Sequence, residues 1–311
     1  MPHAESSFDS EGRQWAWDTV SLNWLKDCPT KYKRFMLEGW RPKGENVHLK
    51  FGGIYAKALE IYHKTRAQYK AITPLSHKEA MYEAIKYALE ASWPWPFTDL
   101  LKSRENLIRS IVWYLDNYED DPCRTVTLSD GTPAVELATR MQLDERNVLI
   151  VHLDRIVEFS GHTYIQDQKT TKGSLGSYYF EGFNPDNQMS AYSVVGHVVY
   201  KTPVQGVMID AAQILVGGTR FERGFTYRTR EQLAEWLADV SWWVGPYQRA
   251  AERADWPMND TSCSKYRSSD PFGNAHGCPL RKVCGADPRV REKYLESDFV
   301  KQPWNPLEER K

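Results

Sequence analysis

The chain has 311 residues, of which 41% are hydrophobic and 26% are charged, and its formal net charge is −1. This composition is typical of a globular protein, and it excludes nucleic-acid binding that depends on overall positive charge alone. The sequence contains no run of about 20 apolar residues, which a membrane span would require. Its first residues are polar and lack the apolar core of a secretory signal. We therefore expect a cytoplasmic protein that makes no membrane contact.

The first third of the chain is predicted to be helical. Apolar residues at helical spacing predict helices on both sides of Pro29 between residues 15 and 39, then at 51–64, 78–92 and 97–118. Pro29 suits a first helical turn, because the N–H that proline lacks would have no partner there. We expect this helical lobe to cover residues 15–120, after a flexible start at 1–14.

The middle of the chain changes to a β pattern. Alternating β-branched residues predict strands at 124–128, 134–143, 148–158 and 162–168, with a tight turn at Ser160-Gly161. A helix at 187–200, strands at 207–216 and 221–227, and a long helix from Thr229 to 254 follow. This order predicts an α/β fold with a central mixed sheet flanked by helices.

Two aspartates and a lysine fall on one predicted hairpin. Asp154 lies within an apolar strand, and Asp167 and Lys169 share a face of the next strand because they are two residues apart. If the strands pair through the turn at 160–161, Asp154 lies opposite Asp167. Two close carboxylates suit Mg²⁺ or Mn²⁺, and a lysine beside them can stabilise charge on a phosphate. The alternative is a surface hairpin with an ordinary salt bridge, since acid-x-Lys is a common tripeptide.

The order of these residues resembles the PD-(D/E)XK nuclease superfamily, specifically its RecB-like exonuclease branch. In that branch an Asp in one strand and an Asp-x-Lys-Thr in the next precede a Gln-x-x-x-Tyr on a helix. Here Gln188 and Tyr192 occupy those helix positions and share one helix face. The resemblance implies a restriction-endonuclease-like fold in which Asp154, Asp167 and the carbonyl of Gln168 bind the metal, and Gln188 and Tyr192 hold the substrate.

Upstream, the sequence departs from the family at one position. The stretch from Phe51 to Glu60 matches a helix motif of the family, but Tyr55 stands where relatives carry a metal-binding histidine. The resemblance implies a substrate-binding or water-holding role for Tyr55. Glu136 matches the acidic residue on the preceding strand, and an exposed strand glutamate is an equally good interpretation.

Four of the five cysteines bracket the predicted core. Cys28 precedes it, and Cys263, Cys278 and Cys284 follow it in a tail at 255–290 that is rich in Cys, Gly, Pro and Ser. Relatives in the RecB-like branch hold a 4Fe–4S cluster with one cysteine before the nuclease core and three after it, which implies such a cluster here. The insertion at 264–277 departs from the usual spacing. Zn²⁺ at the same thiolates, or free thiols, are the alternatives.

The resemblance implies a metal-dependent DNA nuclease, most simply an exonuclease, with its core at 15–254 and a C-terminal tail at 291–311. We expect its partner to be DNA with a free end or a single strand. The resemblance also implies a protein partner in recombination, repair or a CRISPR-type system. From a nuclease that is compact and free-standing we expect a phage or mobile-element origin. The alternatives are a nuclease-fold DNA-binding or scaffold protein with weakened activity, and a zinc-stabilised nuclease without iron.

Overall fold

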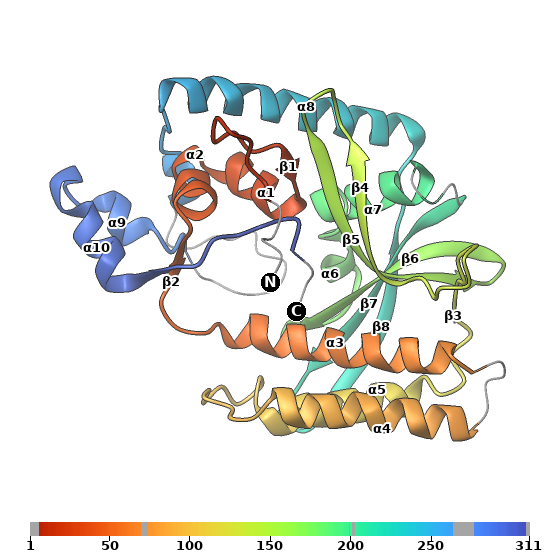
Figure 1. Ribbon diagram of the computed structural model, residues 1–311. Coiled ribbons are helices and arrows are strands. Elements are labelled where there is room, and N and C mark those ends of the chain that lie inside the picture. Colours follow the sequence, from red (N-terminus) through yellow and green to blue (C-terminus); the bar gives the residue numbers. More distant parts are fainter. Residues whose placement is uncertain (1–5, 70–73, 199, 201–202, 264–276, 309–311) are drawn as a thin grey trace. The chain divides into compact units, whose positions relative to one another are not determined.

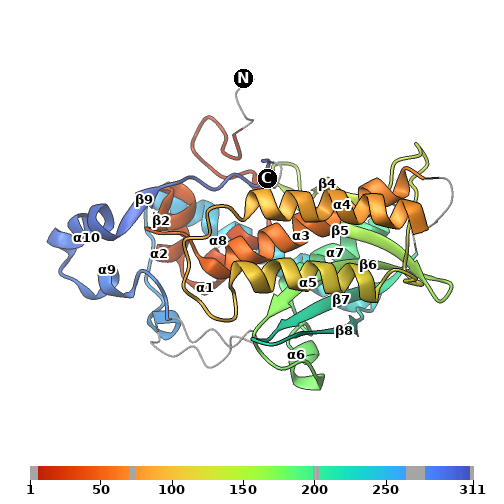
Figure 2. The ribbon, with the colours of Figure 1, turned by 90° about the horizontal axis from the view of Figure 1, so that it is seen from below.

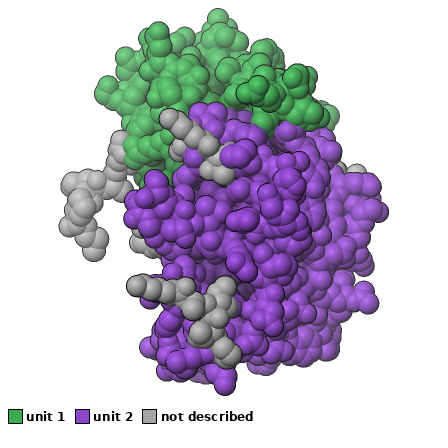
Figure 3. Space-filling view, turned by 90° about the vertical axis from the view of Figure 1, so that its right-hand side faces the viewer, with its two compact units in different colours: residues 1–44, 138–151, 229–311 green, residues 45–137, 152–228 purple. Residues whose placement is uncertain are grey.

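The structure is a computed structural model that describes residues 6–69, 74–198, 200, 203–263 and 277–308. The chain divides into two compact units, which Figure 3 distinguishes by colour. Unit 1 comprises Met1–Gly44, Ala138–Val151 and Thr229–Lys311, and unit 2 comprises Glu45–Leu137 and His152–Arg228. Within the described residues, no helix combines the length and the apolar character that crossing a membrane requires.

A mixed sheet forms the centre of unit 2, as predicted from the order of elements. Strand β5 pairs antiparallel with β6, β6 pairs parallel with β7, and β7 pairs antiparallel with β8. Three further strands, β1 (Ala16–Trp17), β3 and β4, pair with β5. The strands span Arg124–Thr125 (β3), Val135–Gln142 (β4), Val148–Phe159 (β5), His162–Thr171 (β6), Val204–Ile214 (β7) and Thr219–Thr226 (β8).

The hairpin between β5 and β6 has the predicted turn and register. Ser160 and Gly161 have φ angles of 52° and 77°, and two positive φ values are what a two-residue type I′ turn requires. The ladder runs from Phe159↔His162 to Arg155↔Gln166. The next pair in this register is Asp154 with Asp167, as the sequence predicted.

Helices cover both faces of this sheet. Figures 1 and 2 show α3, α4 and α5 together on one face, where α3 contacts β6 and α5 contacts β7 and β8. Helices α6 and α7 contact the sheet through β8 and through β6 and β7, respectively. These helices span Val47–Ala67 (α3), Pro74–Ala91 (α4), Arg104–Asn117 (α5), Ser177–Glu181 (α6) and Asn187–Val198 (α7).

Several predicted helices have different limits in the structure; those predicted at 51–64 and 78–92 are Val47–Ala67 and Pro74–Ala91. The helix predicted at 97–118 begins only at Arg104, because the hydroxyl of Ser103 caps it by accepting a hydrogen bond from the main-chain N–H of Asn106. The helix predicted at 187–200 is described as far as Val198, and residue 199 lies outside the described residues.

Unit 1 is built mainly from the two ends of the chain. Pro29 begins a helix, as predicted, and a π-helix follows it directly. Strand β2 pairs antiparallel with β9, which joins the first 44 residues to the last part of the chain. The elements are β1 (Ala16–Trp17), α1 (Thr19–Asp27), α2 (Pro29–Tyr32), η1 (Lys33–Leu37), β2 (Trp40–Pro42), α8 (Arg230–Arg253), η2 (Asp260–Cys263), α9 (Arg281–Gly285), η3 (Pro288–Val290), α10 (Arg291–Asp298) and β9 (Phe299–Lys301).

The tail contains regular structure that the sequence did not predict. Helix α9 forms where no periodicity is visible, because Leu280 and Val283 are buried in a small core with Phe35, Leu295 and Phe299. Tertiary packing therefore stabilises a helix that is too short to be stable alone.

Candidate active site and cysteine group

Strand β6 directs its polar side chains to both faces of the sheet. Lys169 Nζ donates a hydrogen bond to Gln188 Oε1 of α7 at 3.1 Å, whereas Gln168 Nε2 donates to Tyr114 Oη of α5 at 3.3 Å. Successive residues of a strand point to opposite faces, so Asp167 shares the α7 face with Lys169. The sheet therefore separates the Asp167–Lys169 pair on one face from a buried polar network on the other.

Asp154 reaches across to β6. Its Oδ2 accepts a hydrogen bond of 3.0 Å from the main-chain N–H of Gln168. The β5–β6 ladder ends one pair earlier, at Arg155↔Gln166, so the Asp154 carboxylate bonds to β6 at the point where the strands stop pairing. The two aspartates of the sequence prediction therefore lie on adjacent strands at the same level of the hairpin.

Asp167, Lys169, Gln188 and Tyr192 form a connected chain of contacts. Asp167 is only 1% exposed, and Lys169 Nζ lies 2.5 Å from its Oδ2. The same ammonium donates to Gln188 Oε1, and Gln188 Nε2 donates to Tyr192 Oη at 2.9 Å. The predicted helix pair thus holds the lysine in place beside the carboxylate.

The Asp167 carboxylate has the features of a cation ligand. Within the described part of the chain, neither of its buried oxygens accepts a hydrogen bond. The Lys169 ammonium, 2.5 Å from Oδ2, compensates part of the carboxylate charge, whereas Oδ1 has neither a hydrogen bond nor an ion pair among the described residues. A buried carboxylate oxygen without a partner is costly, and a divalent cation would satisfy it. Carboxylate oxygens are hard ligands, which suit Mg²⁺ or Mn²⁺.

A small pocket adjoins Asp154. Glu136 and Gln168 line it together with Asp154, and α3 contributes Glu60 and His63. Glu136 has a φ of 51°, a left-handed conformation that is costly for a residue with a side chain. Such strain is concentrated at functional sites, which favours the interpretation of Glu136 as a site residue over an ordinary strand glutamate.

Tyr55 lies elsewhere. It is 1% exposed in the core formed by α3, α4 and α5, with its ring 6.1 Å from that of Tyr114. Burial raises its pKa, and the nearby Tyr114 and Asp210 raise it further. The structure therefore links Asp154 to Gln168 and Asp167 to Lys169, whereas Tyr55 contacts Tyr114, whose hydroxyl accepts a hydrogen bond from Gln168.

Two carboxylates that the sequence analysis missed lie near this site. Glu60 is 7% exposed, accepts hydrogen bonds from Lys57 and Lys64, and lines the pocket beside Asp154. Asp186 caps α7 by accepting a hydrogen bond from Met189 N at 3.0 Å. Burial raises the pKa of Asp186 above its usual value; Asp167 adds to this rise, and Lys169 opposes it. A capping aspartate two residues before Gln188 is a signal that the sequence contained.

The four bracketing cysteines all belong to unit 1. Cys28 is buried, and its Sγ accepts a hydrogen bond from Asn259 N at 3.3 Å; Cys263 Sγ donates to the Asn259 carbonyl at 3.5 Å. Burial and the neighbouring Cys263, Cys278 and Cys28 raise the pKa of Cys284 to about 11. The four thiols are thus close enough to influence one another's charge.

Among the residues that the structure describes, no three His, Cys, Asp or Glu side chains are arranged to hold a metal ion. Most of the predicted insertion, residues 264–276, lies outside the described residues. The fifth cysteine, Cys123, is a packing residue: it is buried in unit 2 with Val157, Tyr164 and Met208.

Comparison with known proteins gives one family. The model of the PD-(D/E)XK nuclease superfamily matches residues 19–285. No curated protein matches the chain. Among solved structures, the crystal structure of SSO0001 is similar at 10% sequence identity, over 71% of this chain and 85% of that one, with a TM-score of 0.26. A TM-score this low supports no argument about fold or function.

Proposed function

The chain belongs to the PD-(D/E)XK nuclease superfamily, and from the arrangement of its candidate site we propose that it is an Mg²⁺- or Mn²⁺-dependent DNA exonuclease. The observation that carries this proposal is the buried Asp167 carboxylate, which lies beside Lys169 and has no hydrogen-bond donor among the described residues. A protein partner in recombination, repair or a CRISPR-type system is part of the proposal through family resemblance alone.

Each residue of the site has a distinct part in the proposed hydrolysis. Asp154, Asp167 and the main-chain carbonyl of Gln168 would hold the cation, with Glu136 beside them. When bound, such a cation polarises the phosphate and lowers the pKa of water. Lys169 is positioned by Asp167 and Gln188 to stabilise charge that develops on the phosphate. Gln188 and Tyr192 would contact the nucleic-acid strand, and Tyr55 supports the site only from within the core.

Digestion of end-labelled DNA tests the proposal. Single-stranded, double-stranded and circular substrates are incubated with Mg²⁺ or Mn²⁺, and an exonuclease should leave the circles intact. Asp167→Asn should reduce cleavage at least about a hundredfold, since it removes the charge that binds the cation. Asp130→Asn is the matched control, because Asp130 is fully exposed in a turn before β4. Failure of the wild type to cut any substrate with either metal would contradict the proposal.

A second candidate is a nuclease-fold DNA-binding or scaffold protein with weakened activity. The observation that favours it is the burial of Tyr55 against Tyr114, which leaves the site without a ligand at the usual histidine position. This candidate predicts that the protein binds labelled DNA in a mobility-shift assay yet leaves it intact with both metals.

For the cysteines, we propose a 4Fe–4S cluster bound by Cys28, Cys263, Cys278 and Cys284. Its support is the mutual electrostatic influence of the four thiols in unit 1. Anaerobically purified protein should be brown and contain about four iron and four sulfide per chain. Cys284→Ala should lose the colour and the iron, whereas Cys123→Ala, outside the group, should keep both. Colourless protein with bound zinc would instead establish the zinc-stabilised nuclease.

A further inference from the structure

Unit 2 contains a second, more open pocket that the proposed hydrolysis does not use. It has a volume of about 240 Å³ and lies between α3, α5 and the segment that leads into β3. Its wall includes Tyr62, Arg66, Tyr118, Asp121, Arg124 and Arg155. Three guanidinium groups therefore face one carboxylate across a hollow.

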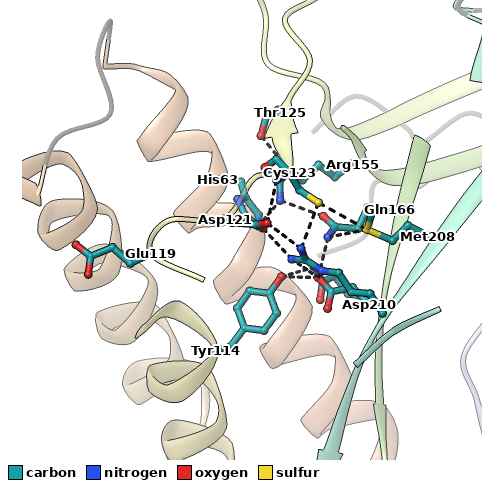
Figure 4. A network of polar contacts seen from close by, with 12 residues as sticks. His63, Tyr114, Glu119, Asp121, Cys123, Thr125, Arg155, Gln166, Met208 and Asp210 are labelled. Carbon is teal, nitrogen blue, oxygen red and sulfur yellow. Dashed lines mark hydrogen bonds and ion pairs between the residues drawn. The ribbon is translucent and has the colours of Figure 1, made fainter. Parts of the chain in front are cut away.

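Arg155 is held rigidly at the inner end of this pocket. It is 4% exposed and donates to His63 Nε2 at 3.1 Å, Gln166 Oε1 at 3.0 Å, Cys123 O at 2.7 Å and Thr125 Oγ1 at 2.9 Å. Figure 4 shows these partners around it. Since arginine always donates, His63 Nε2 accepts, and burial together with Arg155 lowers the pKa of His63. All four partners are neutral, so none of them cancels the charge of Arg155.

The carboxylates of Asp121 and Asp210, next to the pocket, already form ion pairs with Arg223. Arg223 donates to both oxygens of Asp121 at 2.8 Å and lies 3.1 Å from Asp210 Oδ2. Asp210 also accepts from Tyr114 and from Gln166, which links it to Arg155. With both aspartates ionised, the two arginines and two aspartates of this network balance in charge.

Arg66 and Arg124 do not belong to this charge-balanced network. Arg66 NH1 donates to Tyr62 Oη at 2.6 Å and to the main-chain carbonyl of Glu119 at 2.9 Å, while its buried Nε has no hydrogen-bond partner in the described residues. In Figure 4 the Glu119 carboxylate lies apart from the network. Arg124 is exposed and forms no ion pair within the described ranges, although Glu158 is opposite it on β5. The pocket wall thus has two guanidinium groups that form no ion pair among the described residues.

We propose that this pocket binds a small phosphate-bearing ligand. A phosphate dianion would compensate these two guanidiniums, and arginine is well suited to phosphate because its donors form a planar fork. The volume is below the range typical of drug-sized ligands, which favours a ligand no larger than a mononucleotide. The rings of Tyr62 and Tyr118 in the wall provide an apolar surface for a base or sugar.

Isothermal titration calorimetry at fixed, low salt tests the proposal with three probes: inorganic phosphate, deoxyadenosine monophosphate and deoxyadenosine. The wild type should bind the first or the second and not the third. Arg66→Met and Arg124→Met should each weaken binding by roughly tenfold or more, because each removes a charged donor. Arg104→Met is the matched control, since Arg104 lies on α5 outside the pocket and donates to Ser92 Oγ and Leu89 O. The exposed Arg124 serves as the test should the Arg66 variant fail to fold.

Each possible result either supports or contradicts the proposed phosphate site. Equal affinity for phosphate and for the nucleotide supports a site for phosphate alone, and tighter binding of the nucleotide supports a nucleotide site. No binding of either by the wild type, or binding that survives both Arg66→Met and Arg124→Met, overturns the proposal. Binding requires no metal and no cleavage, so the result is independent of whether the nuclease proposal succeeds.

Discussion

Replacing Lys102 with methionine should stabilise the protein at neutral pH, and the gain should shrink as the pH rises. Lys102 is 1% exposed; its Nζ donates to Thr170 Oγ1 at 2.8 Å and lies 4.1 Å from the centroid of the Phe51 ring. No carboxylate accepts a hydrogen bond from it in the described part of the chain. Burial, reinforced by Lys172 and opposed by Asp99, lowers its pKa from 10.5 to about 7.

The size and sign of the effect follow from this pKa. Between pH 7 and 10.5 the unfolded chain holds a proton on Lys102 that the folded chain has released, so the free energy of unfolding rises with pH in that window. The full difference corresponds to about 5 kcal/mol, of which about 2 kcal/mol falls between pH 7 and 9. Below pH 7 both states are protonated, and the cost of the buried charge is complete. Methionine has a similar length and no charge, and it loses about 1 kcal/mol of hydrogen bonding to Thr170.

Urea denaturation of both proteins at pH 7, 8 and 9, with reducing agent present, measures the effect. The stability advantage of Lys102→Met should decrease by about 2 kcal/mol from pH 7 to pH 9. Lys78→Met, on an exposed position of α4, is the matched control and should leave the pH dependence of the wild type unchanged. An advantage that stays constant with pH would refute the inference that the folded protein carries an abnormally acidic Lys102.

Two further predictions concern packing and the site. Gly224→Ala should lower the free energy of unfolding by about 1–3 kcal/mol, because a Cβ there would lie 2.1 Å from Phe180 Cδ1. Gly217→Ala is the control: its Cβ would meet no atom within 4 Å, so it should lower the free energy of unfolding much less. Urea denaturation measures both values. Lys169→Met should reduce kcat at least about a hundredfold, whereas Gln188→Ala should reduce it by only about tenfold, since it removes one of two groups that position the ammonium. Equal losses in the two variants would show that Gln188 does more than position Lys169.

The sequence alone determined the hairpin and the helix pair of the candidate site. Alternating apolar residues specify which face of a strand is buried, and the turn at Ser160-Gly161 then sets the register, which the structure shows as far as Arg155 opposite Gln166. The spacing of Gln188 and Tyr192 likewise determines that both lie on one face of α7. These are local constraints, so they can be read along the chain.

Only the tertiary structure determined which side chains that are far apart in the sequence lie close together in space. Tyr55 lies on the helix where the motif predicts it, yet the packing of α3 against α5 places its ring against Tyr114, away from the acidic pair. The same packing brings Glu60 into the pocket beside Asp154 and buries Lys102 beneath Thr170. Helical periodicity specifies a face but not what that face contacts, because the contact depends on how helices far apart in the sequence pack on the sheet.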